Sequence, residues 1–259
     1  MANYHFEISI ISRGKNRSIT KLANYISGQK LYDNYSGKTY YSRRDDVLYC
    51  DVLLPAHAPV DFHNLQYFCN KIEQSEVRYD ARTAREFKAS LPNELTTEEN
   101  IQIVKEYIRA NFLEHGLGVI AAIHEGRNET NPARNNPHVH MIVSTRTIEA
   151  TGFNKKKCRE LDKYENTTIW RKRWADVQNL AYERNGLPMR VSHESLEIQG
   201  HHNRKPTIHL SRIDWQKEQR GEHTPNGDKK REIQAFNQKC DCSSRHPPNR
   251  TLDIELKLL

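Results

Sequence analysis

The stretch NNPHVHMIVSTR, residues 135–146, places two histidines on alternate positions at the head of an apolar run of strand length. Side chains alternate between the two faces of a strand, so His138 and His140 share one face, about 7 Å apart along the backbone. The preceding apolar run, LGVIAAIHEG, predicts a buried strand that ends at His124. If these two strands pair antiparallel, all three imidazoles can converge on one point.

Strands and helices alternate along the rest of the chain. Alternating or apolar runs predict three more strands, at residues 4–12, 46–55 and 85–92. Caps and apolar spacing predict four helices: after Ser18, from about Asp61 through the charged segment that follows, after Thr96, and over residues 167–186. We expect loop over residues 31–44, and loops with one short helix beyond about Ser192. This order predicts an α+β fold, an antiparallel sheet of about five strands backed by helices on one face.

The composition suits a protein that binds a polyanion. The 259 residues include 40 Lys and Arg against 33 Asp and Glu, which gives a formal charge of +7, and the mean hydropathy is −0.89. The first residues lack the layout of a signal peptide, and no apolar run approaches the roughly 20 residues of a membrane span. Five widely spread cysteines are typical of reduced thiols. We therefore expect a cytoplasmic protein without membrane insertion.

The three histidines allow two interpretations. Neutral imidazoles at His124, His138 and His140 would offer three nitrogen ligands to one cation, and a site with three protein ligands keeps open positions for chemistry. Such a cation could hold a phosphate oxygen and neutralise the charge that develops when phosphorus is attacked. Alternatively, His138 and His140 form a polar strand end and His124 is a hydrogen-bonded core residue. The spacing alone leaves both open.

A nucleophile for that chemistry can be sought among the twelve tyrosines. A phenol has a pKa near 10, so it attacks only where a metal ion, a base or a nearby cation favours loss of its proton. Tyr25 lies on the helix predicted after Ser18, between the basic stretches RGKNR and GQK. Periodicity alone does not separate Tyr25 from Tyr32 or Tyr35.

Several stretches occur in a fixed order over residues 1 to about 225: YHFEISIISRGKNRSITKLANYISGQKLYD, VRYDARTAREFKASLP, AAIHEGRNETNPARNNPHVHMIVSTR, GFNKKK with WRKRWADVQN, and PTIHLS. Together they resemble the relaxase domain of the MobA/MobL family, the MobQ class of the histidine-hydrophobic-histidine (HUH) endonucleases. The resemblance implies a relaxase-like sandwich fold. It also favours the metal interpretation of the histidines.

The resemblance assigns roles to individual residues. It implies that Tyr25 is the nucleophile and that a divalent metal ion is bound, for which we expect Mn²⁺ or Mg²⁺, with Ni²⁺ or Zn²⁺ as alternatives. Glu86 matches a family glutamate that acts as base or orienter, and Glu76 and Asp80 are weaker candidates for the base. The metal ligands implied are His124, His138 and His140.

The activity implied is metal-dependent nicking and strand transfer at a plasmid origin of transfer, through a 5′-phosphotyrosyl intermediate. A rolling-circle replication initiator and a non-catalytic origin-binding autorepressor are the alternatives. Expected partners are single-stranded DNA, an origin hairpin, accessory mobilisation proteins and a type IV coupling protein, and we expect a monomer. We assign residues 1–225, the extent of the resemblance, to the nicking domain and residues 226–259 to a flexible tail.

Basic stretches predict where the DNA lies, because cations interleaved with aromatic or amide groups neutralise phosphates and stack on bases. SRGKNR lies closest to the predicted nucleophile, so we expect its cations to contact the strand near the cut. The full set of predicted DNA contacts is Arg13, Lys15, Arg17, Lys155, Lys156, Lys157, Arg171, Arg173, Arg204 and Lys205.

Overall fold

The computed structural model describes residues 4–128, 131, 135–208 and 210–245, and the chain divides into two compact units between His193 and Glu194. The first unit carries the sheet. Its helices and strands are β1 (Phe6–Ser12), α1 (Ile19–Ser27), β2 (Leu31–Asp33), β3 (Lys38–Tyr40), β4 (Val47–Leu53), α2 (Leu65–Gln74), β5 (Arg82–Ser90), α3 (Thr97–Asn111), β6 (Val119–His124), β7 (His138–Ser144), β8 (Arg146–Glu149), β9 (Gly152–Lys157) and α4 (Glu165–Arg184).

The main sheet has five strands in the order β1-β5-β7-β6-β4, and every neighbouring pair is antiparallel. This confirms the predicted α+β fold with a five-stranded antiparallel sheet. In the register, His138 lies opposite His124 of β6, and His140 lies opposite Lys88 of β5. Strand β7 is central, so its polar head is enclosed by neighbours on both sides.

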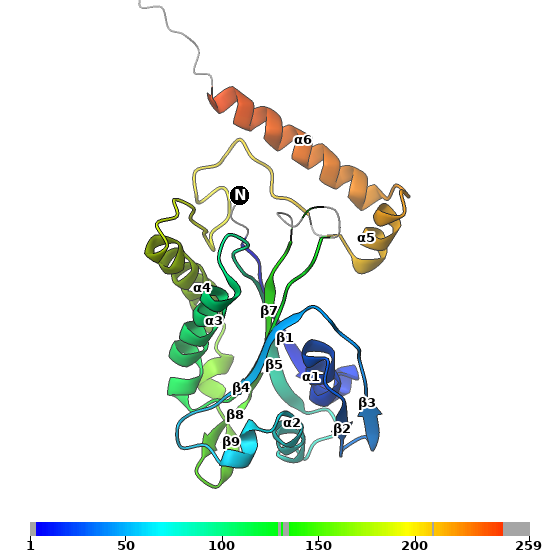
Figure 1. The fold of residues 1–259 in the computed structure, drawn as a ribbon, viewed down its shortest axis with the longest axis vertical. Helices are drawn as coiled ribbons and strands as arrows, with labels where there is room; N and C mark the ends of the chain where they lie inside the picture. Colours follow the sequence, from blue (N-terminus) through cyan, green and yellow to red (C-terminus); the bar gives the residue numbers. More distant parts are fainter. Residues whose placement is uncertain (1–3, 129–130, 132–134, 209, 246–259) are drawn as a thin grey trace, which may run out of the picture. The chain divides into compact units, whose positions relative to one another are not determined.

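Helices cover both faces of this sheet, not one as the sequence predicts (Figure 1). On one face, α3 and α4 pack through Val104 and Trp174 onto strand residues that include Val139. On the other face, α1 and α2 pack through Ile26 and Phe68 onto residues that include Ile142. The central strands are therefore buried on both sides, as continuous apolar runs such as VIAAI require. The histidine side chains belong to the face covered by α1 and α2.

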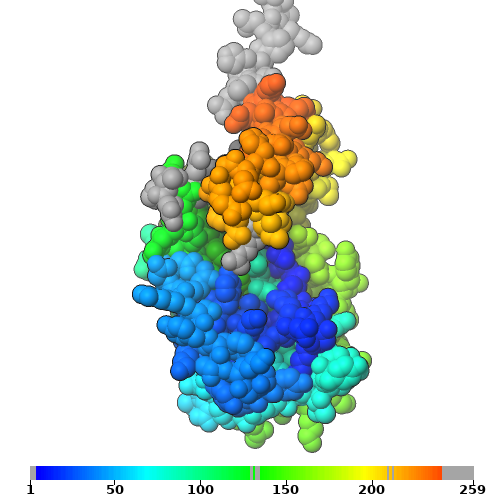
Figure 2. Space-filling model, turned by 90° about the vertical axis from the view of Figure 1, so that its right-hand side faces the viewer, coloured from blue at the N-terminus to red at the C-terminus, as the bar shows by residue number. Residues whose placement is uncertain are grey.

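Two hairpins lie where the sequence predicts loop or gives no strand. Strands β2 and β3 pair within the segment expected to be loop, and β8 pairs with β9 after β7. Helix α2 ends at Gln74, and does not continue through the charged residues that follow. The N-terminal segment containing α1, shown in dark blue, is exposed on the face seen in Figure 2.

The second unit contains α5 (Arg212–Gln219) and α6 (Pro225–Arg245), so the expectation of loops with one short helix is wrong. Ser211 caps α5 by accepting from the amide of Asp214. The predicted boundary at residue 225 stays a prediction, although residues 225–245 are helical. Within the part of the chain described, no helix is long and apolar enough to cross a membrane.

Candidate active site

The strand pairing brings the three predicted histidines into one cluster. The ring centroids of His124, His138 and His140 lie 4.9 to 5.3 Å apart, and one ligand atom from each lies within 4.8 Å of the others. His124 is fully buried and His140 is 4% exposed. Val139 points to the opposite face and anchors the strand in the core. The cluster is thus built on the adjoining ends of β6 and β7, two inner strands of the sheet.

A hydrogen bond to an acceptor fixes one nitrogen of each imidazole. His124 Nε2 donates to the backbone oxygen of Ile26 over 2.7 Å, and His138 Nδ1 donates to that of Asn136 over 2.8 Å. His140 Nδ1 donates to Glu86 Oε1 over 3.2 Å. Carbonyl and carboxylate oxygens can only accept a hydrogen bond. In each neutral ring the proton is therefore on the nitrogen that makes this bond, and the other nitrogen carries the free lone pair.

One of these lone pairs has no protein partner. His124 Nδ1 is buried and accepts no hydrogen bond from the residues that the structure describes. Burial lowers the pKa of His124 to about 4, and the nearby charges of His140 and Arg44 act in the same direction. Burial likewise lowers the pKa of His138. Neutral rings with inward lone pairs are the form that binds a cation, so these residues could hold a metal ion.

Glu86 supports the cluster from the neighbouring strand. Its buried carboxylate accepts from His140, from Ser9 Oγ at 3.1 Å and from the guanidinium of Arg17. Burial raises the pKa of Glu86, but the hydrogen bonds from His140 and Arg17 outweigh it and lower the pKa to about 2. A carboxylate so strongly held in its charged form is a poor proton acceptor at neutral pH. This geometry favours the orienting role over the role of base.

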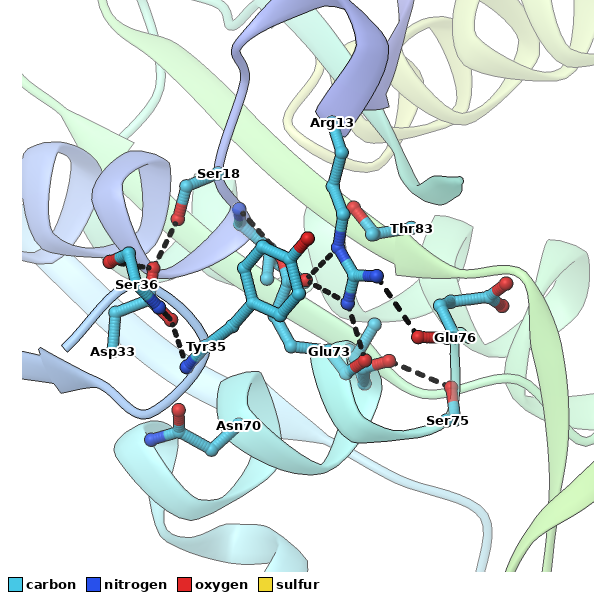
Figure 3. Close-up of polar contacts among 12 residues, drawn as sticks. Arg13, Ser18, Asp33, Tyr35, Ser36, Asn70, Glu73, Ser75, Glu76 and Thr83 are labelled. Carbon is cyan, nitrogen blue, oxygen red and sulfur yellow. Dashed lines mark hydrogen bonds and ion pairs between the residues drawn. The ribbon is translucent and has the colours of Figure 1, made fainter. Parts of the chain in front are cut away.

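Tyr25 lies beside the cluster on α1. Ser18 caps the start of this helix, and Gly28, with φ of 69°, ends it. The Tyr25 ring lies 6.5 Å from that of His124 and 6.3 Å from that of His140, edge to face in both cases. Its side chain is half exposed, so a substrate can reach it. By contrast, the Tyr35 ring stacks on Arg13 in a different part of the unit (Figure 3).

Arg44 is a site residue that the sequence prediction missed. Its guanidinium carbon lies 4.7 Å from the centroid of the Tyr25 ring, and Asp46 holds it through two hydrogen bonds of 2.8 and 2.6 Å. Gly28, in the left-handed region that favours glycine, lies against this arginine: a Cβ there would be 3.4 Å from that of Arg44, an ordinary van der Waals contact. The Arg-x-Asp spacing just before β4 was the sequence signal that could have indicated this arginine–aspartate pair.

Lys88 is a second residue that the prediction missed. It lies opposite His140 in the register, on the same face as Glu86. Burial is the main cause of the lowered pKa of His138, and the positive charge of Lys88 lowers this pKa further. Lys88 follows Glu86 by two residues in the same strand, so alternation places both on one face, and this pattern could have identified Lys88. Arg44 and Lys88 together give the histidine cluster a positive surrounding that suits an anionic substrate.

Comparison with known proteins identifies the family. Residues 17–220 match the MobA/MobL family. The chain belongs to the MobA/MobL family. It is 32% identical over 238 residues to the mobilization protein MobL of Acidithiobacillus ferridurans, covering 81% of this chain and 62% of that protein. It is 35% identical over 150 residues to the probable mobilization protein MobA of Bifidobacterium longum, covering 58% of this chain and 26% of that protein.

A solved structure has a similar fold. A chain reported under the molecular basis of vancomycin resistance transfer in Staphylococcus aureus is 30% identical, with a TM-score of 0.67, and the match covers 75% of this chain and 100% of that one. The chain spans less than two thirds of the curated MobA/MobL relatives named above.

Arg13 of this MobA/MobL protein is not available to DNA, so that prediction is wrong. Its guanidinium is buried and donates to Glu73 Oε2 at 2.9 and 2.8 Å and to the backbone oxygen of Glu76 (Figure 3). It also donates to the backbone oxygen of Arg78. Arg17 is likewise held by Glu86, with its side chain one-third exposed. Of the cations in this turn, Lys15 is exposed.

The remaining predicted DNA contacts of the first unit lie away from the histidine cluster. The residues of β9, 155–157, follow the far end of β7 and line a separate cavity of about 1020 Å³. Arg171 and Arg173 lie on α4, across the sheet from the cluster. Arg204 and Lys205 belong to the second unit. Any DNA contact by residues 155–157, Arg171 or Arg173 is therefore separate from the histidine face.

The two alternative bases lie outside the cluster as well. Glu76 pairs with Arg146 at 2.9 Å and with Lys157 at 3.0 Å, in the cavity beyond the far end of the sheet. Asp80 pairs with Arg78 at 2.8 Å in the same region. Neither carboxylate contacts a histidine of the cluster, so neither is placed to act as its base.

Proposed function

We propose that this chain cuts one strand of DNA at a plasmid origin of transfer and keeps the cut end through a 5′-phosphotyrosyl bond to Tyr25. The observation that carries the proposal is the arrangement of the histidines. Each has one nitrogen tied to an acceptor and one lone pair left over, and the half-exposed Tyr25 ring lies against two of them. The mobilisation proteins among the relatives support the same function.

The donor set fits a divalent cation. Three imidazoles leave open positions, and the buried, unpartnered Nδ1 of His124 is explained if it binds a metal ion. When bound, the cation would supply positive charge to the non-bridging oxygens of the scissile phosphate. We propose Mn²⁺ or Mg²⁺ as this ion, with Ni²⁺ or Zn²⁺ as alternatives.

The chain's own groups would carry the reaction. The Tyr25 hydroxyl oxygen forms a bond to phosphorus while the bond from phosphorus to O3′ breaks, and the leaving oxygen takes up a proton to become a free 3′ hydroxyl. The tyrosine proton passes to solvent, which the exposure of the ring permits. Arg44 stabilises the negative charge on the attacking oxygen, and Glu86 holds His140 in the binding tautomer. A returning 3′ hydroxyl reverses the step and reseals the strand.

We assign this reaction to a nicking domain of residues 1–225 acting as a cytoplasmic monomer on single-stranded DNA. An origin hairpin, accessory mobilisation proteins and a type IV coupling protein are the proposed partners. Lys15, which is exposed, is proposed to contact the strand near the cut. The cations of β9, at the far end of the sheet, are proposed to contact a more distant part of the DNA.

A covalent-capture assay tests the proposal. Single-stranded fragments tiled across the replicon that encodes the chain are incubated with the protein and Mn²⁺ or Mg²⁺, then separated under denaturing conditions. We expect one fragment to give a stable protein–DNA adduct that disappears in Tyr25→Phe and in His140→Ala, while Tyr32→Ala retains it. An adduct that persists in Tyr25→Phe would refute the assignment of the nucleophile. No adduct from any fragment would favour a non-catalytic DNA-binding protein.

A further inference from the structure

A cavity of about 430 Å³ opens next to the proposed nucleophile and is not part of the histidine cluster. Tyr25 forms one wall, on α1. Tyr40 and Tyr41 form another, at the end of β3, and the residues between Asn16 and Asn24 complete it. We call this cavity the Tyr41 pocket. Its volume falls within the range of cavities that bind small molecules.

We propose that the Tyr41 pocket binds the base of the nucleotide on the 3′ side of the nick, the one that stays joined to Tyr25. This inference rests on the proposed nicking function. It assigns the pocket a role in choosing the DNA sequence that is cut, a role that the histidines cannot perform because they face the phosphate.

The chemistry of the walls matches a nucleobase. Tyr41 is 70% exposed and Tyr40 is half-buried, so the pocket presents aromatic surface to solvent, and unpaired bases stack on such surface. Lys21 is exposed at the same cavity and can contact the adjoining phosphate. A ring that stacks beside a cation is the combination that recurs where proteins bind single strands.

The walls are held in place before any ligand arrives. Ser42 Oγ donates to Asn24 Oδ1 over 2.8 Å, which ties the residue after Tyr41 to α1. The Asn24 amide also donates to the backbone oxygen of Gln29 over 2.7 Å. Because the aromatic wall is fixed to the helix that carries Tyr25, binding a base there requires little ordering of the protein.

The same hairpin is fastened to α2 on its other side. Gln66 Oε1 accepts from the amide of Tyr32 over 2.8 Å, and Asn70 Oδ1 accepts from that of Asn34 over 2.8 Å. Tyr40 pairs with Leu31 in the β2–β3 register, so these bonds also set the position of the aromatic wall. The pocket is therefore lined by α1, the turn before it and the end of the hairpin, and the hairpin is held in turn by α2.

The direction of attack selects the nucleotide. In an in-line displacement, the leaving O3′ departs on the side of phosphorus opposite the attacking oxygen. The nucleoside on the 5′ side of the nick is therefore directed away from Tyr25. The nucleoside on the 3′ side stays joined to the phosphorus and remains next to the tyrosine, where the Tyr41 pocket shares the Tyr25 wall.

Base substitution around the mapped nick tests this pocket. The captured fragment is synthesised with each of the four bases, or an abasic site, at the position 3′ of the nick and, separately, at the position 5′ of it. Adduct formation by the wild type should fall about five- to ten-fold with the abasic site at the 3′ position. In Tyr41→Ala that dependence should vanish, whereas Tyr41→Phe should retain it because the ring still stacks.

Tyr32→Ala is the matched control, since Tyr32 is an exposed tyrosine of the same hairpin that does not line the pocket. It should retain the wild-type dependence. If Tyr41→Ala forms adducts with an unchanged dependence on the 3′ base, or alters only the 5′ position, the pocket assignment is wrong even though nicking stands. Failure of the wild type to form any adduct would instead refute the nicking function.

Discussion

His124 donates a hydrogen bond from Nε2 to the backbone oxygen of Ile26 over 2.7 Å, and Ile26 directly follows Tyr25 in α1. One proposed metal ligand is thereby bonded to the helix that carries the proposed nucleophile. The bond fixes the tautomer of His124 and, at the same time, the depth at which α1 packs on the sheet. A shift of the helix would therefore disturb both the metal centre and the attacking group.

Arg44→Ala should slow adduct formation about 100-fold, because it removes the charge held against the attacking phenol. Arg44→Lys should recover part of the rate, since it keeps the charge but loses the paired hydrogen bonds to Asp46. The rate constant for adduct formation at saturating DNA measures this. Arg43→Ala, at the exposed neighbouring position, is the control. Equal rates for Arg44→Ala and Arg43→Ala would remove Arg44 from the reaction.

Glu86→Gln should weaken Mn²⁺ binding about ten-fold, because the amide no longer holds the charge that orients His140. Calorimetric titration of the protein without DNA measures this affinity. Glu7→Gln, an exposed glutamate on the neighbouring strand, should bind Mn²⁺ as the wild type does. Wild-type affinity in Glu86→Gln would show that Glu86 does not support the metal ligands.

His124 should make stability depend on pH in the absence of metal. Its pKa is about 4 in the folded chain and about 6.5 when unfolded, so the unfolded chain holds the proton more tightly. The contribution of neutral His124 to the free energy of unfolding is therefore complete above pH 6.5 and is lost as the pH falls toward 4. Between pH 7 and 5 we expect the wild type to lose about 2 kcal/mol of unfolding free energy through this residue.

Urea unfolding with a chelator present measures that dependence. His124→Gln should show a shallower decline over the same pH range, because it has no imidazole to protonate. The range stays above pH 4.5, below which the lowered pKa of Glu86 adds a second loss of stability. Parallel declines in the two proteins would mean that His124 is not held neutral by the fold.

Gly126→Ala should weaken metal binding without touching a ligand. Gly126 has φ of 59°, and a Cβ there would lie 2.2 Å from the backbone oxygen of Asn136, the atom that accepts from His138. The substitution must displace this oxygen and with it the orientation of His138. Mn²⁺ affinity by calorimetry should drop, whereas Gly152→Ala, which has open space around it, should leave affinity unchanged. Unaltered affinity in Gly126→Ala would contradict the role of the Asn136 bond.

The histidine cluster follows from local rules. Alternation places His138 and His140 on one face of a strand, and a single antiparallel pairing adds His124, so the sequence contains all the information needed. The two-sided cover of the sheet was also indicated, because VIAAI is apolar at every position. The prediction of helices on one face is wrong because a strand that is apolar at every position needs cover on both of its faces.

Contacts between distant segments were not predictable in the same way. Arg13 belongs to a basic turn that suits DNA, yet its partner Glu73 lies 60 residues further on, and only the packing of α2 brings the two together. Arg44 lies beside Tyr25 because the β2–β3 hairpin and the turn at Gly28 bring the chain back to α1. The spacing of apolar residues in the sequence does not predict the course of these connections. Helix α6 is mostly polar, with Ile233 as a buried apolar residue, and its start is set by Thr224, whose hydroxyl oxygen accepts from the amide of Gly227 over 3.0 Å.

The central claim is that DNA becomes covalently attached to Tyr25, and peptide mapping of the captured adduct tests it most directly. The adduct formed with Mn²⁺ is digested with nuclease and protease, and the peptide carrying a nucleotide is sequenced by tandem mass spectrometry. We predict a 5′-linked nucleotide on Tyr25. A nucleotide on Tyr40, Tyr41 or any other residue would contradict the account.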